Sequence, residues 1–168
     1  MFDKLKPDYI FDGVFDITAE FLKSRGIVLL LCDLDNTLAP YGGKPPSREL
    51  INWKETLNAA GITIFIVSNT KKPRAELFAR QFGAGYIKHA RKPRTDNILL
   101  AIRACKATPR TAALVGDQLF TDTLGANNSG CTSILVRPIS LNNPLYLLRN
   151  LAEKAILRLA NKKAPLPK

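Results

Sequence analysis

The chain has 168 residues and a formal net charge of +11, with 46% apolar and 23% charged residues. This length and composition exclude a disordered chain and indicate one compact domain with a sizeable core. The three cysteines, Cys32, Cys105 and Cys131, are scattered and odd in number, which argues against a disulfide framework or a cysteine metal site.

The sequence shows neither a signal-peptide pattern nor an apolar run long enough to cross a bilayer. We therefore expect a cytoplasmic protein in a reducing compartment, which could rest on the inner face of a membrane. Residues 71–110 hold eleven Lys/Arg against two acids (+9), and residues 141–168 hold six against one (+5). Such clustering favours anionic partners, namely phosphate esters, acidic lipid surfaces or nucleic acid.

The apolar pattern predicts strands that alternate with helices. An N-terminal segment, 1–17, is expected to pack on the domain, and Thr18 caps a short helix over 19–25. β-branched and apolar runs predict five strands, at 27–32, 62–67, 86–87, 112–115 and 132–136. Helices are predicted after the cap Ser47 and over 72–82, 98–105 and 122–128. The alternation indicates a single α/β domain, residues 1–140, with a five-stranded, mostly parallel sheet and helices on both faces.

The last segment has a different character. Asn143-Pro144 starts a predicted basic amphipathic helix within 141–163, and residues 164–168 are expected to be disordered. This helix has two equally supported interpretations. It covers the sheet with a solvated basic face, or it lies in a membrane interface.

Polar residues end the predicted strands at the same edge each time. Asp33 and Asp35 follow the first strand, Ser68-Asn69 the second, Lys92 the third and Asp117 the fourth. The carboxyl ends of parallel strands share one edge of a sheet, so these groups can converge. Carboxylates suit Mg²⁺, while an ammonium and a hydroxyl suit the oxygens of a phosphoryl group. The set therefore predicts a phosphoryl-transfer site.

With these residues in place, the chain resembles the haloacid dehalogenase (HAD) superfamily of phosphohydrolases. The four motifs of that family appear in order as Asp33-Leu34-Asp35-Asn36-Thr37, Ser68-Asn69-Thr70, Lys92-Pro93 and Gly116-Asp117-Gln118-Leu119-Phe120-Thr121-Asp122. This ordered set is far more specific than any one motif. More narrowly, the chain is similar to subfamily IIIA, the YqeG-like group, which is related to phosphatidylglycerophosphate phosphatases.

The resemblance implies a role for each motif residue. Asp33 would be the nucleophile that forms an aspartyl-phosphate, and Asp35 the acid and then the base. Asp33, Asp117 and the backbone carbonyl of Asp35 would hold Mg²⁺. Ser68, Asn69 and Lys92 would bind the phosphoryl group. Thr37 and Asp122 would support the site.

Each motif has a simpler interpretation when it is taken alone. A calcium loop starting at Asp33 is excluded, because Leu38 stands where glycine is needed and Lys44 where glutamate is needed. By themselves, Ser68 would be a helix cap, Lys92 a surface charge and Gly116-Asp117 a turn. Because all four motifs occur together in the order typical of the family, a catalytic interpretation is favoured over these simpler ones.

The short spacing between motifs leaves no room for an inserted cap domain, so we expect an open site that accepts a phosphate on a large molecule. The resemblance implies a phospholipid substrate, phosphatidylglycerophosphate, and basic residues near the site fit an anionic membrane. Two alternatives stay open. One is a phosphatase acting on a soluble or protein phosphate. The other is an RNA- or ribosome-associated binding protein, although nucleic acid is an unfavoured partner because no RNA-binding motif is evident.

Overall fold

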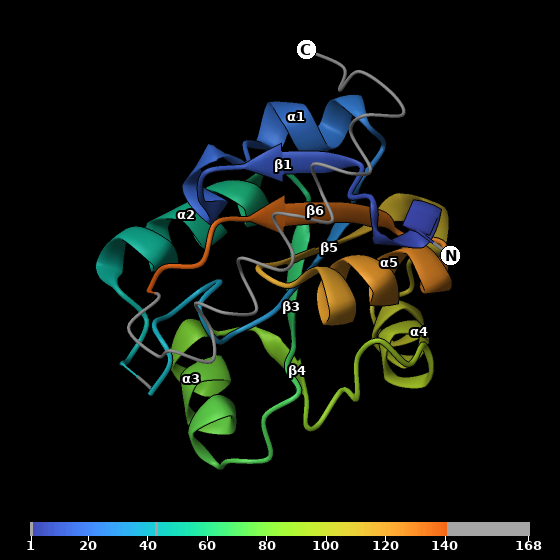
Figure 1. Ribbon diagram of the computed structural model, residues 1–168. Helices are drawn as coiled ribbons and strands as arrows, with labels where there is room; N and C mark the ends of the chain where they lie inside the picture. Colours follow the sequence, from blue (N-terminus) through green and yellow to red (C-terminus); the bar gives the residue numbers. More distant parts are fainter. Residues whose placement is uncertain (1, 43, 141–168) are drawn as a thin grey trace.

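The computed structural model describes residues 2–42 and 44–140, and within them one parallel sheet forms the centre of the molecule (Figure 1). Its strand order is β1-β6-β5-β2-β3-β4, and every neighbouring pair is parallel. The strands are β1 (Tyr9–Phe11), β2 (Leu29–Cys32), β3 (Thr63–Val67), β4 (Gly85–Ile87), β5 (Ala112–Gly116) and β6 (Thr132–Val136). The α/β class and the parallel sheet predicted from the sequence are confirmed.

The prediction of five strands was wrong by one, because the N-terminal segment adds β1 at the edge of the sheet. Tyr9 pairs with Ile134, and the Asp8 carboxylate accepts hydrogen bonds from the Ser133 backbone N–H (2.8 Å) and hydroxyl (2.9 Å). The ring of Tyr9 lies 4.9 Å from that of Phe21. The partners of β1 are thus distant in sequence, and a three-residue run gives no local periodicity that would reveal it.

Within the described ranges, five α-helices cover the sheet: α1 (Ala19–Ser24), α2 (Arg48–Ala59), α3 (Arg74–Phe82), α4 (Asp96–Ala104) and α5 (Leu124–Ser129). Each follows a predicted helical stretch closely, and Ser47 caps α2 by accepting a hydrogen bond from Leu50 N–H (3.1 Å). The helix predicted over 122–128 begins differently. A π-helical turn, Leu119–Thr123, precedes α5, and the Asp122 side chain comes from that turn.

Alternation along β2 divides the core into two layers. Leu30 and Cys32 pack with side chains of α1, α2 and α3, whereas Leu29 and Leu31 pack with those of α4 and α5. All four side chains are almost completely buried. Burying one leucine contributes roughly 1.5–3 kcal/mol, so β2 anchors both layers and fixes where the chain leaves the sheet.

The connections bring all strand ends of interest to one edge. Asp33 N–H still donates to Val115 O (2.9 Å), so the acidic segment starts as an extension of β2 beside β5. Between Asp35 and Lys92 the described residues form only loops, α2, β3, α3 and β4, with no inserted cap domain. No helix in the described ranges is long and apolar enough to cross a membrane. The predicted C-terminal helix and tail, 141–168, lie outside the described residues.

Candidate active site

A buried lysine joins two carboxylates that come from different strand ends. Lys92 Nζ donates to Asp33 Oδ1 (2.6 Å) and lies 2.7 Å from Asp122 Oδ1. The three residues are 4%, 5% and 1% exposed for Lys92, Asp33 and Asp122. Charges this deep are stable only when they are paired and hydrogen-bonded, and Lys92 pairs with both carboxylates at once.

Proton affinities in this cluster follow from burial and charge. Burial raises the pKa of the Asp33 carboxyl to about 7, against the opposing effect of the Lys92 ammonium. For Lys92, burial lowers the pKa, but Asp122 and Asp33 together outweigh it and hold the pKa above its ordinary value. Lys92 therefore stays an ammonium, and the Asp33 carboxyl keeps its proton to a higher pH than an exposed aspartate does.

A third buried carboxylate, Asp117, completes an acidic cluster. Asp33, Asp117 and Asp122 each offer a carboxylate oxygen, and these oxygens lie within 4.8 Å of one another. The cluster thus brings together three buried carboxylates, and Lys92 pairs with two of them. Clustered carboxylate oxygens are what a hard divalent cation such as Mg²⁺ requires, so the residues fit a metal site.

Gly116 makes the position of Asp122 possible. A Cβ at residue 116 would lie 2.2 Å from the carboxylate carbon of Asp122 and 2.5 Å from its Cβ. Asp122 Oδ2 also accepts a hydrogen bond from Gln118 N–H (3.1 Å). The glycine in the fourth motif is therefore needed for space, since the aspartate folds back over it.

Asn69 fixes the backbone of Lys92. Its Oδ1 accepts from Lys92 N–H (2.7 Å), and its Nδ2 donates to Lys92 O (2.9 Å). Ala90 N–H donates to Ser68 O (2.8 Å), which joins the same two loops a second time. On the other side, a Cβ at Gly125 would lie 3.4 Å from Pro93 Cα, so α5 packs closely against this turn. The loop after β3 thus holds the ammonium of Lys92 at Asp33.

Asp35 is held by a bend and by an arginine. Asn36 has φ +63°, a left-handed conformation that asparagine tolerates, and it turns the chain sharply after Asp35. Arg74, the first residue of α3, donates from Nη2 to Asp35 Oδ1. Asp35 and Arg74 have side chains that are 16% and 20% exposed, so their ion pair lies at the rim of the site.

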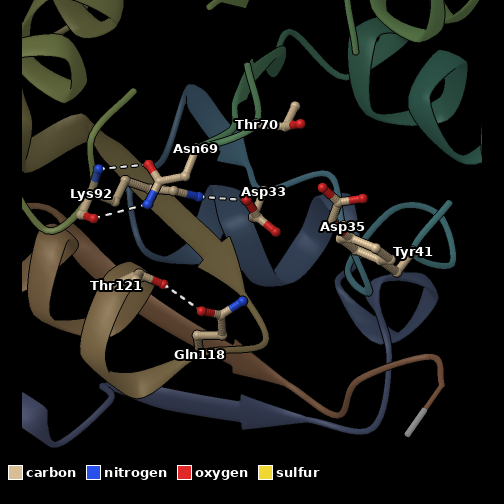
Figure 2. Close-up of a pocket in the computed structure, with 8 residues that line it drawn as sticks. All are labelled: Asp33, Asp35, Tyr41, Asn69, Thr70, Lys92, Gln118 and Thr121. Atoms are coloured by element: carbon tan, nitrogen blue, oxygen red, sulfur yellow. Dashed lines mark hydrogen bonds and ion pairs between the residues drawn. The ribbon is translucent and has the colours of Figure 1, made fainter. Parts of the chain in front are cut away.

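These residues surround a polar cavity of about 260 Å³ (Figure 2). In Figure 2, Lys92 lies on one side of Asp33, and Asp35 with Tyr41 lies on the other. The lining residues are Asp33, Asp35, Tyr41, Asn69, Thr70, Lys92, Gln118 and Thr121. The cavity has room for a phosphoryl group and an ion, whereas sites for drug-sized ligands usually start at roughly 300 Å³.

Most of the predicted site residues therefore come together. Asp33, Asp35, Asn69 and Lys92 line the cavity, and Asp117 and Asp122 join Asp33 in the acidic cluster. Ser68 and Thr37 are buried beside it and are not among the lining residues, and Ser68 Oγ accepts from Thr70 N–H (3.3 Å).

Sequence reasoning missed four lining residues, Tyr41, Thr70, Gln118 and Thr121. Thr70, Gln118 and Thr121 lie inside the quoted motifs, so motif membership was a usable signal for them. Tyr41 lies in a loop without a motif, and the sequence shows Arg74 only as one of the basic residues of 71–110. No local pattern indicates the contact of Arg74 with Asp35.

Comparison with known proteins agrees with this geometry. The family description "Hydrolase: haloacid dehalogenase-like hydrolase" matches residues 37–130. "Probable phosphatase YqeG" of Bacillus subtilis (strain 168) is 37% identical over 134 residues, which cover 80% of this chain and 78% of that protein. "Phosphatidylglycerophosphate phosphatase 1, chloroplastic/mitochondrial" of Arabidopsis thaliana is 27% identical over 153 residues, covering 83% of this chain but only 43% of that protein.

Solved structures share the fold at low sequence identity. A HAD superfamily (subfamily III A) hydrolase from Legionella pneumophila superposes with a TM-score of 0.52 and 17% identity, covering 86% of this chain and 95% of that one. The 3-deoxy-D-manno-octulosonate 8-phosphate phosphatase of Yersinia pestis superposes with a TM-score of 0.54 and 16% identity, covering 91% and 93%. Together with the sequence matches, these findings establish that the chain belongs to the haloacid dehalogenase-like hydrolases and is a phosphatase of the YqeG-like group.

Proposed function

We propose that this phosphatase hydrolyses a phosphomonoester through an aspartyl-phosphate on Asp33, with Mg²⁺ as cofactor, and that its substrate is phosphatidylglycerophosphate. The observation that carries the reaction type is the buried Asp33–Lys92 pair (2.6 Å) in a cavity that Asp35 also lines. A carboxylate is a weak nucleophile toward a phosphate dianion unless cations offset the repulsion, and Lys92 is placed to do so.

In the first step, a carboxylate oxygen of Asp33 attacks phosphorus. The Oδ1 of Asp33 accepts a hydrogen bond from Lys92 Nζ, so Oδ2 is the oxygen that attacks. The ester P–O bond breaks, and the leaving oxygen takes a proton from Asp35. Lys92 stabilises the charge on the phosphoryl oxygens, and Ser68 and Asn69 serve as hydrogen-bond donors to them.

In the second step, water attacks the phosphorus of the aspartyl-phosphate. Asp35, now a carboxylate, accepts the proton of that water, the bond from phosphorus to Asp33 breaks, and inorganic phosphate leaves. One residue thus acts as acid and then as base, which requires that it lie within reach of both oxygens. Asp35 lies at the rim of the cavity, beside Asp33, and meets this requirement.

The metal site proposed for Mg²⁺ consists of Asp33, Asp117 and the backbone carbonyl of Asp35. Bound there, the ion would offset negative charge on the transferring phosphoryl group. The convergence of three buried carboxylate oxygens within 4.8 Å of one another supports a divalent cation at this place. Asp122 positions Lys92, and buried Thr37 supports the turn after Asp35.

Three observations support a lipid substrate: the shape of the cavity, the basic residues near it and the name of one relative. The cavity of about 260 Å³ admits a phosphoryl group, and no cap in the described ranges closes over it, so a bulky leaving group stays outside. Exposed Lys71 and Lys72 follow the second motif, and exposed Arg91 directly precedes Lys92. Each basic residue near an anionic bilayer contributes ~1 kcal/mol to membrane attraction.

Two other basic residues near this edge contribute less, because acids pair with them. Arg94 Nη2 lies 3.1 Å from Asp96, and Arg137 Nε lies 2.9 Å from Asp12. The name of the Arabidopsis relative supplies the lipid itself. We further propose that residues 1–140 form the catalytic domain at the membrane surface, with the helix of 141–163 packed on that domain or on the membrane.

The test is phosphate release from phosphatidylglycerophosphate in anionic vesicles, against a panel of soluble phosphomonoesters, with and without Mg²⁺. Asp33→Asn should abolish release, and Glu55→Gln, at an exposed position of α2, should leave it unchanged. Turnover of soluble esters with no release from the lipid would support a soluble or protein phosphate as substrate instead. Full release by Asp33→Asn would contradict the mechanism.

A further inference from the structure

Two cations lie beside the cavity on its Asp35 side, against the ring of a lining residue, Tyr41. The Arg74 guanidinium lies 5.6 Å from the centre of the Tyr41 ring, and Lys72 Nζ lies 5.8 Å from it. Arg74 also donates to Asp35 Oδ1, and both Tyr41 and Asp35 line the cavity (Figure 2). Two cations from the start of α3 thus meet one ring from the loop after β2, at the mouth of the site.

Positive charge exceeds negative charge at this place. Two cations face one carboxylate, Asp35, and no ion pair to Lys72 occurs within the described part of the chain. Arg80, further along the same helix, is instead matched by one acid, Glu76 (2.7 Å). Lys72 and Arg74 together therefore leave net positive charge at the mouth of the cavity, which favours an anion there.

The position of Lys72 and Arg74 beside Asp35 indicates which part of the substrate would carry the anion. Asp35 is the residue proposed to protonate the leaving oxygen, so the leaving group must extend past Asp35, away from Lys92. An anionic group on the leaving group, a few bonds from the ester, would then meet Arg74 and Lys72. Arginine binds phosphate oxygens with two parallel N–H donors, and lysine adds a mobile charge.

From this arrangement we propose that Lys72, Arg74 and Tyr41 form a second anion subsite, which binds a phosphodiester carried by the leaving group of the substrate. This inference rests on the proposed function and deepens it. Phosphatidylglycerophosphate carries such a phosphodiester on the same glycerol as its terminal phosphate. The Tyr41 ring keeps both cations at the mouth and contacts the glycerol between the two phosphates.

The subsite also couples recognition to chemistry. When the subsite is empty, Arg74 donates a hydrogen bond to Oδ1 of Asp35, one of the two oxygens from which Asp35 could protonate the leaving group. A phosphodiester that binds Arg74 competes for the guanidinium and frees that oxygen. A substrate without a second anion lacks this effect, so the enzyme should discriminate against simple phosphomonoesters even when no membrane is present.

The experiment compares two soluble substrates, glycerol 3-phosphate and the deacylated headgroup, glycerophosphoglycerol phosphate, which differ by one phosphodiester. The intact enzyme should prefer the deacylated headgroup by about 10-fold or more in kcat/KM, the size of effect that a charged hydrogen bond produces. Arg74→Gln and Lys72→Gln should each reduce this ratio several-fold. Arg80→Gln, on the exposed face of the same helix, should preserve it.

Lys72 is exposed, so Lys72→Gln keeps the test informative even if Arg74→Gln folds poorly, and thermal melting verifies folding of each variant. An unchanged preference ratio in folded Arg74→Gln and Lys72→Gln would overturn the subsite. So would variants that lose activity on lipid vesicles yet keep the soluble ratio, because their cations would then bind neighbouring lipid headgroups. Asp33→Asn that still hydrolyses either substrate would instead refute the proposed function, so the two failures are distinguishable.

Discussion

The close contact between Gly116 and Asp122 makes a sharp prediction for Gly116→Ala. The added methyl group would lie 2.2 Å from the Asp122 carboxylate and 2.5 Å from its Cβ, and Asp122 is too buried to move aside freely. Overpacking of this kind costs roughly 1–3 kcal/mol. Displacing the carboxylate from Gln118 N–H and Lys92 adds the loss of charged hydrogen bonds, each worth about 1.5–3 kcal/mol.

We therefore expect Gly116→Ala to lower the free energy of unfolding by roughly 2.5–6 kcal/mol, the overpacking cost plus the loss of one such hydrogen bond, measured by urea unfolding of the metal-free protein. Phosphatase activity should fall at least ~10-fold, since Asp122 no longer positions Lys92. The matched control is Gly13→Ala. Nothing lies within 4 Å of a Cβ there, and its φ of −160° suits alanine. A Gly116→Ala protein with the stability and activity of the Gly13→Ala protein would refute the packing argument.

Three further predictions concern the buried cluster. Lys92→Met should destabilise the metal-free protein by about 3–5 kcal/mol in urea unfolding, because two carboxylates lose their counter-ion. Adding Asp122→Asn to Lys92→Met should recover part of that loss. Strictly additive effects of the two substitutions would contradict the coupling between these residues. Asn69→Ala should lower kcat and lower the free energy of unfolding by about 1–3 kcal/mol, since the Lys92 N–H and C=O lose their partners while the charges stay paired. An unchanged kcat would show that the two backbone contacts are dispensable. Finally, burial raises the Asp33 pKa from 3.8 to about 7, so the folded protein holds a proton that the unfolded chain has released. The stability of the metal-free protein should therefore fall as pH rises from 4 to 7. Because Asp33 must lose its proton to bind the ion, Mg²⁺ affinity measured by calorimetry should rise over the same window, by up to about 10-fold per pH unit. A pH-independent affinity would contradict the raised pKa of Asp33.

Local patterns predicted the parts of the fold that depend on local periodicity. The apolar run before Asp33 indicated a strand buried on both faces, and β2 is that strand, with Leu29 and Leu30 facing opposite layers. The parallel sheet then required Asp33, Lys92 and Asp117 to share one edge, as they do. Strand β1 was missed, because its stability comes from pairing with β6 and from Asp8 binding Ser133, contacts that no window of sequence contains.

For the site, too, the sequence indicated which residues take part but not which of them contact one another. Polar residues at strand ends identified the chemical groups, but their partnerships depend on side-chain directions that the sequence does not encode locally. Arg74 resembles any first-turn helix residue until α3 is placed beside the loop that carries Asp35. The glycine of the fourth motif reads as a turn former, and its requirement for space appears only when Asp122 folds back over it.

The central claim is that Asp33 becomes phosphorylated, and covalent trapping tests it most directly. Enzyme mixed with phosphatidylglycerophosphate labelled in its terminal phosphate is quenched in acid during the first turnover and digested. We predict an acid-stable, hydroxylamine-labile phosphate on the peptide that contains Asp33, with no label in Asp33→Asn. Label on another residue, or rapid phosphate release with no labelled peptide at any quench time, would contradict the account.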